Sequence, residues 1–101
     1  MKHTLDYQIE KHPLQTVLGP IEKEEKKLDE RIQDIYSHVL SAKAEAAREP
    51  KAQKKYERMQ MRHASLERQI FVVRARRYAV EQEMLQDIVR KADVVSSSYS
   101  V

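Results

Sequence analysis

The side chains that could do chemistry in this 101-residue chain are four histidines, 16 carboxylates and 19 Lys or Arg residues, and cysteine is absent. The single glycine, Gly19, excludes a glycine-rich phosphate loop, and no nucleophile stands at a recognisable spacing from a base. The histidines are too far apart in sequence to match a zinc-binding motif. We therefore expect a non-enzymatic protein with no catalytic residue, cofactor or metal. The four histidines are His3, His12, His38 and His63.

Basic residues gather in one part of the chain. Residues 51–78 contain nine Lys or Arg and two Glu, whereas residues 21–50 contain six basic and eight acidic residues. A basic stretch is typical of proteins that bind phosphate groups, so a nucleic-acid-associated helical protein is one alternative. The basic side chains are spread over several faces of a predicted helix, however, and no nucleic-acid-binding motif is present. The charge pattern therefore favours protein over nucleic acid as the partner.

The composition predicts an all-α fold in a single domain. One glycine and three prolines are too few turn residues for a sheet protein, and helix-forming residues are abundant. The longest run of bulky apolar residues covers residues 70–73, far short of the ~20 residues that span a bilayer. The first six residues include an acid and no apolar stretch, unlike a signal peptide. These features, with the absence of cysteine, predict a cytoplasmic protein with no membrane insertion.

Proline and glycine mark the boundaries of the predicted helices. Pro20 suits the first turn of a helix, with Gly19 as its N-cap, and Pro50 ends that helix. No glycine or proline follows Pro50, so a second, longer helix is expected after it. The predicted segments are an N-terminal helical arm (1–18), a first long helix (20–48), a second long helix (51–93) and a flexible tail (94–101).

Apolar residues in both long helices recur at alternating spacings of three and four, which is the heptad pattern of a coiled coil. A short connection makes the two helices antiparallel neighbours, and folding the chain about Pro50 places Leu28 near Ile70. Facing residues then have numbers that add up to about 98. The sequence therefore predicts a long antiparallel helical hairpin of the coiled-coil type. The residues of this core seam are Leu28, Ile32, Ile35, Val39, Ala42 and Ala46, then Ala52, Tyr56, Met59, His63, Leu66, Ile70, Val73, Arg77, Val80 and Met84.

The second helix is predicted to outrun the first and to carry more apolar surface than one neighbour can bury. Phe71, Tyr78 and Leu85 repeat at seven-residue spacing beside the core seam. The N-terminal arm could fold back and close a three-helix bundle, or this surface could bind another chain. We favour another chain, because a two-helix hairpin buries little surface by itself. The predicted partner-binding residues are Ile70, Phe71, Val73, Tyr78, Val80, Met84, Leu85 and Ile88.

In layout, residues 20–92 resemble the small helical-hairpin chaperones and export adaptors of bacterial type III secretion, with a cysteine-free polar hairpin and a turn near Arg48-Glu49-Pro50-Lys51. The resemblance rests on no individual residue. It implies a protein that lends helices to aggregation-prone coiled-coil partners during protein transport. A structural subunit of a larger coiled-coil complex is equally consistent with the layout. We expect a coiled-coil interaction protein that works as a homodimer or hetero-oligomer.

Overall fold

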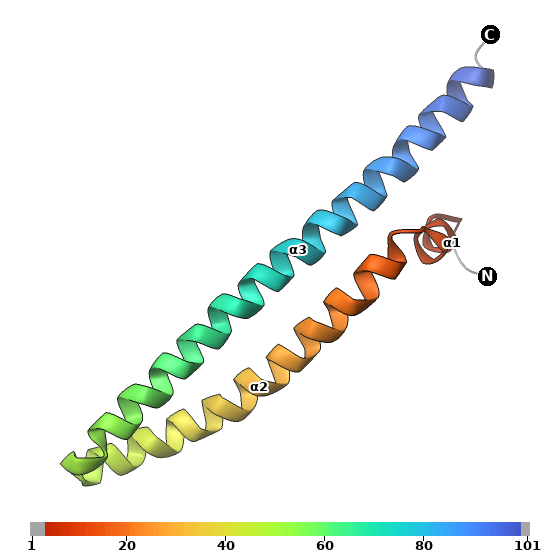
Figure 1. Ribbon diagram of the computed structural model, residues 1–101. Helices are drawn as coiled ribbons and strands as arrows, with labels where there is room; N and C mark the ends of the chain where they lie inside the picture. Colours follow the sequence, from red (N-terminus) through yellow and green to blue (C-terminus); the bar gives the residue numbers. More distant parts are fainter. Residues whose placement is uncertain (1–3, 100–101) are drawn as a thin grey trace. The chain divides into compact units, whose positions relative to one another are not determined.

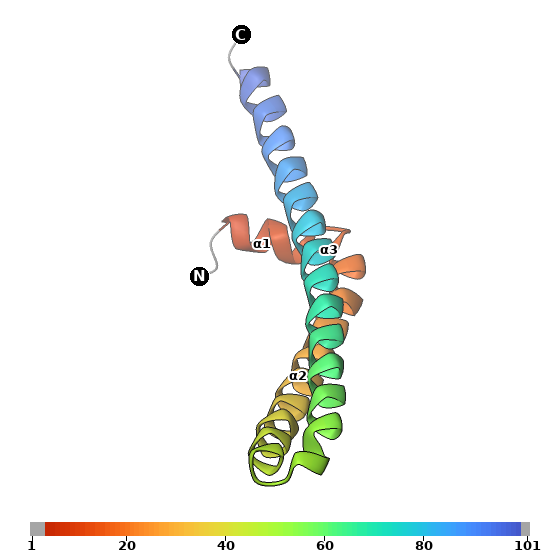
Figure 2. The same ribbon diagram turned by 90° about the vertical axis from the view of Figure 1, so that its left-hand side faces the viewer.

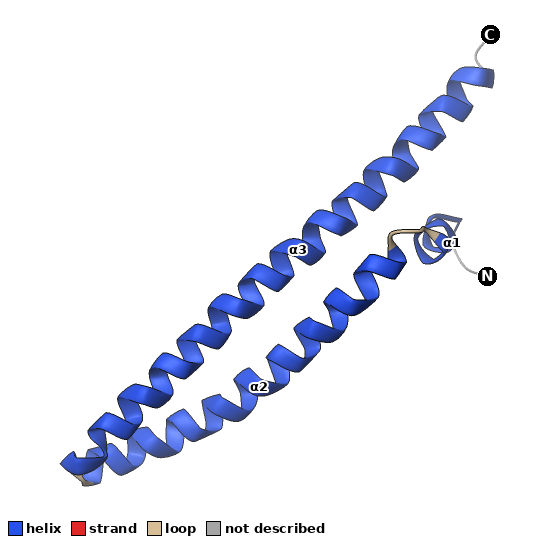
Figure 3. Cartoon of the chain, viewed as in Figure 1, coloured by secondary structure: helices blue, strands red, loops and turns tan. Residues whose placement is uncertain are grey.

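The computed structural model of this protein describes the backbone of residues 4–99 and the side chains of residues 4–92. Nearly all of the described backbone is helical, and none of it forms a β-strand (Figure 3). None of the helices in this range combines the length and apolar character needed to cross a bilayer. The elements are α1 (Thr4–Lys11), α2 (Gln15–Arg48), a 3-10 turn η1 (Pro50–Ala52) and α3 (Gln53–Tyr99) (Figure 1).

Contacts divide the chain into two compact units, and α2 and α3 contribute to both. Unit 1 holds α1, the start of α2 as far as Glu22, and α3 from Ala75 onward. Unit 2 runs from Lys23 to Arg74 and holds the rest of α2, η1 and the first part of α3. Each unit has its own internal packing.

In unit 2, α2 and α3 lie side by side and antiparallel, joined by a tight turn (Figures 1 and 2). The ring of Pro50 pushes the preceding Glu49 out of the helical region, and Glu49 is extended at φ −128° and ψ 113°. The N–H of Ala52 donates to the carbonyl of Glu49 at 3.0 Å and closes the turn. The predicted all-α class and antiparallel hairpin are confirmed, as is the end of the first long helix at Arg48.

The core of unit 2 is the core seam expected from the heptad pattern. Every predicted seam residue within 28–46 and 52–73 is buried or half-buried. This outcome follows from the helical period, because residues three and four apart share one face of a helix. The most enclosed side chains, with exposed fractions of 3–8%, are Leu28, Ala42, Ala52, Ile70 and Val73.

Side-chain contacts in unit 2 confirm the predicted register to within two residues. Nζ of Lys55 lies 3.5 Å from a carboxylate oxygen of Glu45. The rings of Tyr36 and His63 lie 5.8 Å apart between centroids, in a tilted arrangement. The residue numbers of these two pairs add up to 100 and 99. The turn at Glu49 and the heptad pattern therefore set the alignment of the two helices.

In unit 1, α1 lies across α3 (Figure 2) and buries part of it. Leu18, Met84 and Ile88 form a buried cluster, with exposed fractions of 2–9%. The N-terminal arm therefore folds back onto α3, and the predicted N-terminal helical arm is confirmed. The residues packed around this cluster are Ile9, Leu14 and Val80.

The start of α2 corrects the predicted boundary at Pro20, since the helix already begins at Gln15. The N–H groups of residues 15–18 bond to the carbonyls of residues 12–14 at 2.9–3.2 Å, so the first turn forms before the proline is reached. Pro20 lacks the N–H that would bond to the carbonyl of Thr16. One helical hydrogen bond is therefore missing close to the helix start, where the loss disturbs little.

The end of α3 corrects the second predicted boundary. The helix continues past residue 93 to Tyr99, because no glycine or proline interrupts it. The backbone of residues 94–99 is thus helical rather than a flexible tail. Residues 100 and 101 lie outside the described part of the chain.

Gly19 lies inside α2, and no atom other than those of its chain neighbours and of the helix's own backbone lies within 4 Å of the position that a Cβ would occupy. Gly19→Ala should therefore raise the free energy of unfolding by about 0.5–1 kcal/mol, which is the cost of glycine inside a helix. Thermal unfolding followed by circular dichroism measures this change. A variant that melts at or below the wild-type temperature would show that residue 19 is not helical.

Two leucines of α2 test the core seam with a matched control. Leu28 is 6% exposed and Leu40 is 50% exposed. Leu28→Asp should lower the free energy of unfolding by several kcal/mol, because the substitution buries an unpaired charge. Leu40→Asp should change it by less than about 1 kcal/mol. Equal losses in a chemical denaturation experiment would contradict the burial pattern.

Candidate protein-interaction site

The structure divides the eight predicted partner-binding residues by exposure. Those that are buried inside the chain, at 2–9%, are Ile70, Val73, Met84 and Ile88. In this conformation these four stabilise the fold of the chain itself. Two more, Val80 and Leu85, are half-buried. The remaining two face outward, with 74% of Phe71 and 63% of Tyr78 exposed.

Helix α3 carries a second heptad repeat on the side opposite its core seam. Spacings of three and four alternate from Met61 to Ala92, and eight of the ten positions are apolar. Four of its large apolar side chains are exposed, including Met61 at 72% and Val89 at 57%, while Leu85 is half-buried. We call this set the outer seam. It consists of Met61, Ala64, Arg68, Phe71, Ala75, Tyr78, Gln82, Leu85, Val89 and Ala92.

Shallow hollows lie along the outer seam in each unit. The hollow in unit 2 is lined by Ala64, Glu67, Arg68, Phe71 and Val72. The hollow in unit 1 is lined by Gln82, Leu85, Gln86, Val89 and Arg90. Four residues in each set follow the spacing i, i+3, i+4, i+7. This is the spacing of the four residues that form a hole for one side chain of a facing helix in a coiled coil.

Sequence reasoning found part of the outer seam and missed Met61 and Val89. The signal that could have found them was the continuing alternation of three and four. Two polar positions, Arg68 and Gln82, interrupt that alternation. Without these two polar positions, only separate pairs of apolar residues seven positions apart are apparent. The continuous heptad repeat becomes apparent when both are included.

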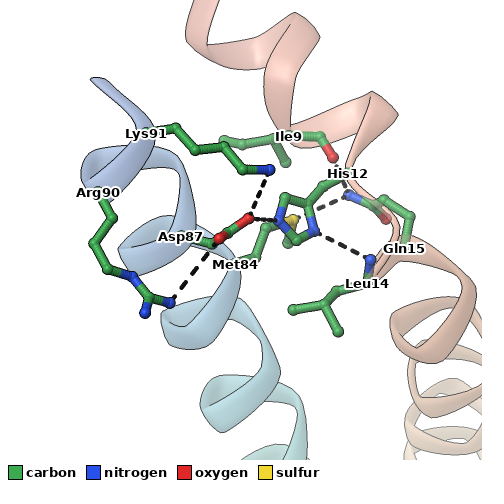
Figure 4. Close-up of polar contacts among 8 residues, drawn as sticks. All are labelled: Ile9, His12, Leu14, Gln15, Met84, Asp87, Arg90 and Lys91. Atoms are coloured by element: carbon green, nitrogen blue, oxygen red, sulfur yellow. Dashed lines mark hydrogen bonds and ion pairs between the residues drawn. The ribbon is translucent and has the colours of Figure 1, made fainter. Parts of the chain in front are cut away.

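In unit 1, a part-buried polar pair joins His12, which directly follows α1, to Asp87 of α3 (Figure 4). Nε2 of His12 lies 2.8 Å from Oδ2 of Asp87, and 8% of the His12 side chain is exposed. The N–H of Leu14 donates to Nδ1 of the same ring at 3.1 Å, so Nε2 carries the proton and donates to the carboxylate. Nε2 of Gln15 donates to the carbonyl of Ile9 at 2.8 Å. This bond gives a hydrogen-bond donor to a backbone carbonyl in the last turn of α1.

The carboxylate of Asp87 is surrounded by donors. The hydrogen bonds from His12 and then from Lys91 lower the pKa of Asp87 below its ordinary value. Nζ of Lys91 lies 3.1 Å from Oδ2, and a guanidinium nitrogen of Arg90 lies 3.9 Å from Oδ1. The charged form of Asp87 is therefore the form that binds α1.

The described residues hold no group of three or more His, Asp or Glu side chains placed to bind a metal ion. Comparisons with protein-family models, with curated proteins and with solved structures found no match to this chain.

Replacing Asp87 with Asn should weaken the docking of α1. The pKa of Asp87 is lowered in the folded chain. Its negative charge therefore stabilises the fold at pH values above the ordinary aspartate pKa of about 3.9. That contribution is lost as the pH falls through the lower native pKa. Asp87→Asn should therefore melt below the wild type at pH 7, and the difference should shrink as the pH falls below about 4.

Thermal unfolding between pH 7 and pH 3 measures this difference. A suitable control is Asp6→Asn, which removes an exposed carboxylate of α1 and should leave the melting temperature at pH 7 unchanged. A constant gap between Asp87→Asn and the wild type across the whole pH range would contradict the assigned role of the carboxylate.

Proposed function

We propose that this chain is a non-enzymatic interaction module that binds α-helical segments of partner proteins along the outer seam of α3. Adaptors, chaperones and assembly subunits of the coiled-coil type work in this way. The proposal is carried by one observation. Phe71 and Tyr78, the aromatic residues of the outer seam, stand one heptad apart with 74% and 63% of their surface exposed.

Exposed aromatic side chains in such a regular row favour helix binding on energetic grounds. Aromatic residues contribute disproportionately to interfaces, because they bury a large area while few torsions are fixed. Small residues alternate with them, since Ala64 and Ala75 also belong to the seam. A facing helix can approach closely at the small residues while the large ones fill its grooves. Burial of this surface would add to the thin core of the hairpin.

A basic nucleic-acid-associated protein is the second candidate, and one observation favours it. Within the described residues, Arg58, Arg62 and Arg68 have no carboxylate within ion-pair distance, whereas Lys55 and Arg74 do. Binding to phosphates would weaken steeply and log-linearly with salt concentration. Burial of the apolar outer seam would depend little on salt.

Phe71→Ala combined with Tyr78→Ala should weaken partner binding at least about tenfold, since each buried aromatic contributes more than about 1 kcal/mol. The measurement is quantitative recovery of co-purifying proteins from cells that make this protein, with its own copies counted separately. Circular dichroism should show nearly unchanged helix content, because neither side chain belongs to the core.

The matched control is Tyr36→Ala combined with Leu40→Ala, which removes two residues of α2 that are 52% and 50% exposed. This control should leave binding unchanged. Arg58→Glu combined with Arg62→Glu should also have little effect on a helix-binding module, and would abolish binding to nucleic acid. Equal recovery with wild type and with the Phe71 and Tyr78 double variant would show that the outer seam is not the binding surface.

A further inference from the structure

We infer that the outer seam binds a second copy of the same chain, so that two α3 helices pack antiparallel with Ala75 of each copy facing Tyr78 of the other. This inference rests on the proposed function and names its partner. Among the α3 residues whose side chains the structure describes, up to residue 92, the five large apolar ones that the fold leaves exposed lie on the outer seam or directly beside it. They are Met61, Phe71, Val72, Tyr78 and Val89.

Side-chain size favours the antiparallel orientation. A two-fold axis that passes between Ala75 and Tyr78 would relate the two antiparallel α3 helices. Each of the ten outer-seam residues of one copy then faces an outer-seam residue of the other. Large residues then meet small or flexible ones, which is how helices pack closely without voids. The facing pairs are Met61 with Ala92, Ala64 with Val89, Arg68 with Leu85, Phe71 with Gln82, and Ala75 with Tyr78.

A parallel pair in register is disfavoured by the same positions. Each residue would then face its own copy, so Phe71 would meet Phe71 while Ala64 would meet Ala64. The two Phe71 side chains would hold the helices apart, and a void would then remain between the two Ala64 side chains. Arg68 would also face Arg68, which places two like charges inside the seam. The antiparallel arrangement avoids both problems.

Charge at the edge of the seam agrees with this register. Positions that flank an antiparallel seam pair with their counterparts, which places Arg74 of each copy beside Glu81 of the other. The Arg74 side chain is 52% exposed, and its pairs with Glu25 and Asp29 within the chain are long, at 3.7 and 3.9 Å. Glu81 is 34% exposed and lies 3.3 Å from Arg77. Both side chains can therefore reach a second copy.

The hollows and the other flank match the same register. Leu85 of the second copy would enter the hollow lined by Ala64 and Phe71, and Arg68 of the second copy would lay its aliphatic stem in the hollow beside Leu85. On the opposite flank, Val72 of each copy meets Ala79 of the other. The arrangement therefore buries the five exposed large apolar residues in the part of α3 whose side chains are described.

A charge exchange tests the pairing. Arg74→Glu alone, or Glu81→Arg alone, turns two attractive pairs of the dimer into two repulsive ones. Each variant should raise the Kd for self-association roughly tenfold, as measured by sedimentation equilibrium. In an equimolar mixture of the two variants the heterodimer regains both attractive pairs, so association should return to the wild-type level. A mixture no tighter than its components would overturn the register.

Cysteine pairing reports the orientation, because the chain has no cysteine of its own. Ala64→Cys mixed with Val89→Cys should give a disulfide-linked heterodimer on oxidation, while neither variant links to itself. Self-linking of each variant would instead show a parallel pair and overturn the inference. The control mixture, Gln69→Cys with Glu83→Cys, places thiols off the seam at nearly the same layer and should remain unlinked.

The failure of this inference can be told apart from failure of the proposed function. A purified wild type that sediments as a monomer at about 100 μM, and whose outer-seam cysteines do not link, would overturn the dimer. The proposed function would still stand if co-purifying proteins depended on Phe71 and Tyr78. A wild-type dimer that is disrupted by the Phe71 and Tyr78 double variant, and not by the Tyr36 and Leu40 double variant, supports the inference.

Discussion

The burial of one narrow apolar face of α3 is the interaction on which the rest of this structure depends. Charged residues make up 35% of the chain, and among the described residues no large side chain is completely enclosed. Helix α3 therefore cannot be stabilised by a thick core and relies on a row of residues three and four apart. In unit 2 this row packs on α2, and in unit 1 it packs on α1 and the start of α2.

The packing of unit 1 combines an apolar contact with a polar one. Leu18, Met84 and Ile88 supply the buried apolar surface, which is insensitive to salt and pH. His12 and Asp87 add a hydrogen bond that exists only in one orientation of α1, because Nδ1 of the ring is already occupied by the N–H of Leu14. The apolar cluster therefore holds α1 on α3, and the polar pair fixes how it lies there.

The choice of buried face on α3 also determines which face of the helix is exposed to other proteins. Successive residues of a helix are separated by about 100°, so fixing the core seam on one side fixes the opposite side as well. The outer seam is thus presented outward by the same contacts that bury Ile70 and Met84. A second heptad repeat is not needed for the fold of one chain, and its exposed aromatic residues support the proposal that it binds helices.

The sequence by itself determined the helices, the turn at Pro50, and which side of each long helix is buried. These features follow from local geometry, because proline acts on its neighbours and the helical period relates residues only three and four apart. The pair formed by His12 and Asp87, 75 positions apart, was decided only by the tertiary structure. So was the burial of Ile88, which lies off the predicted core seam and packs with Leu18 from the start of α2. No local period encodes a contact between segments at opposite ends of the chain.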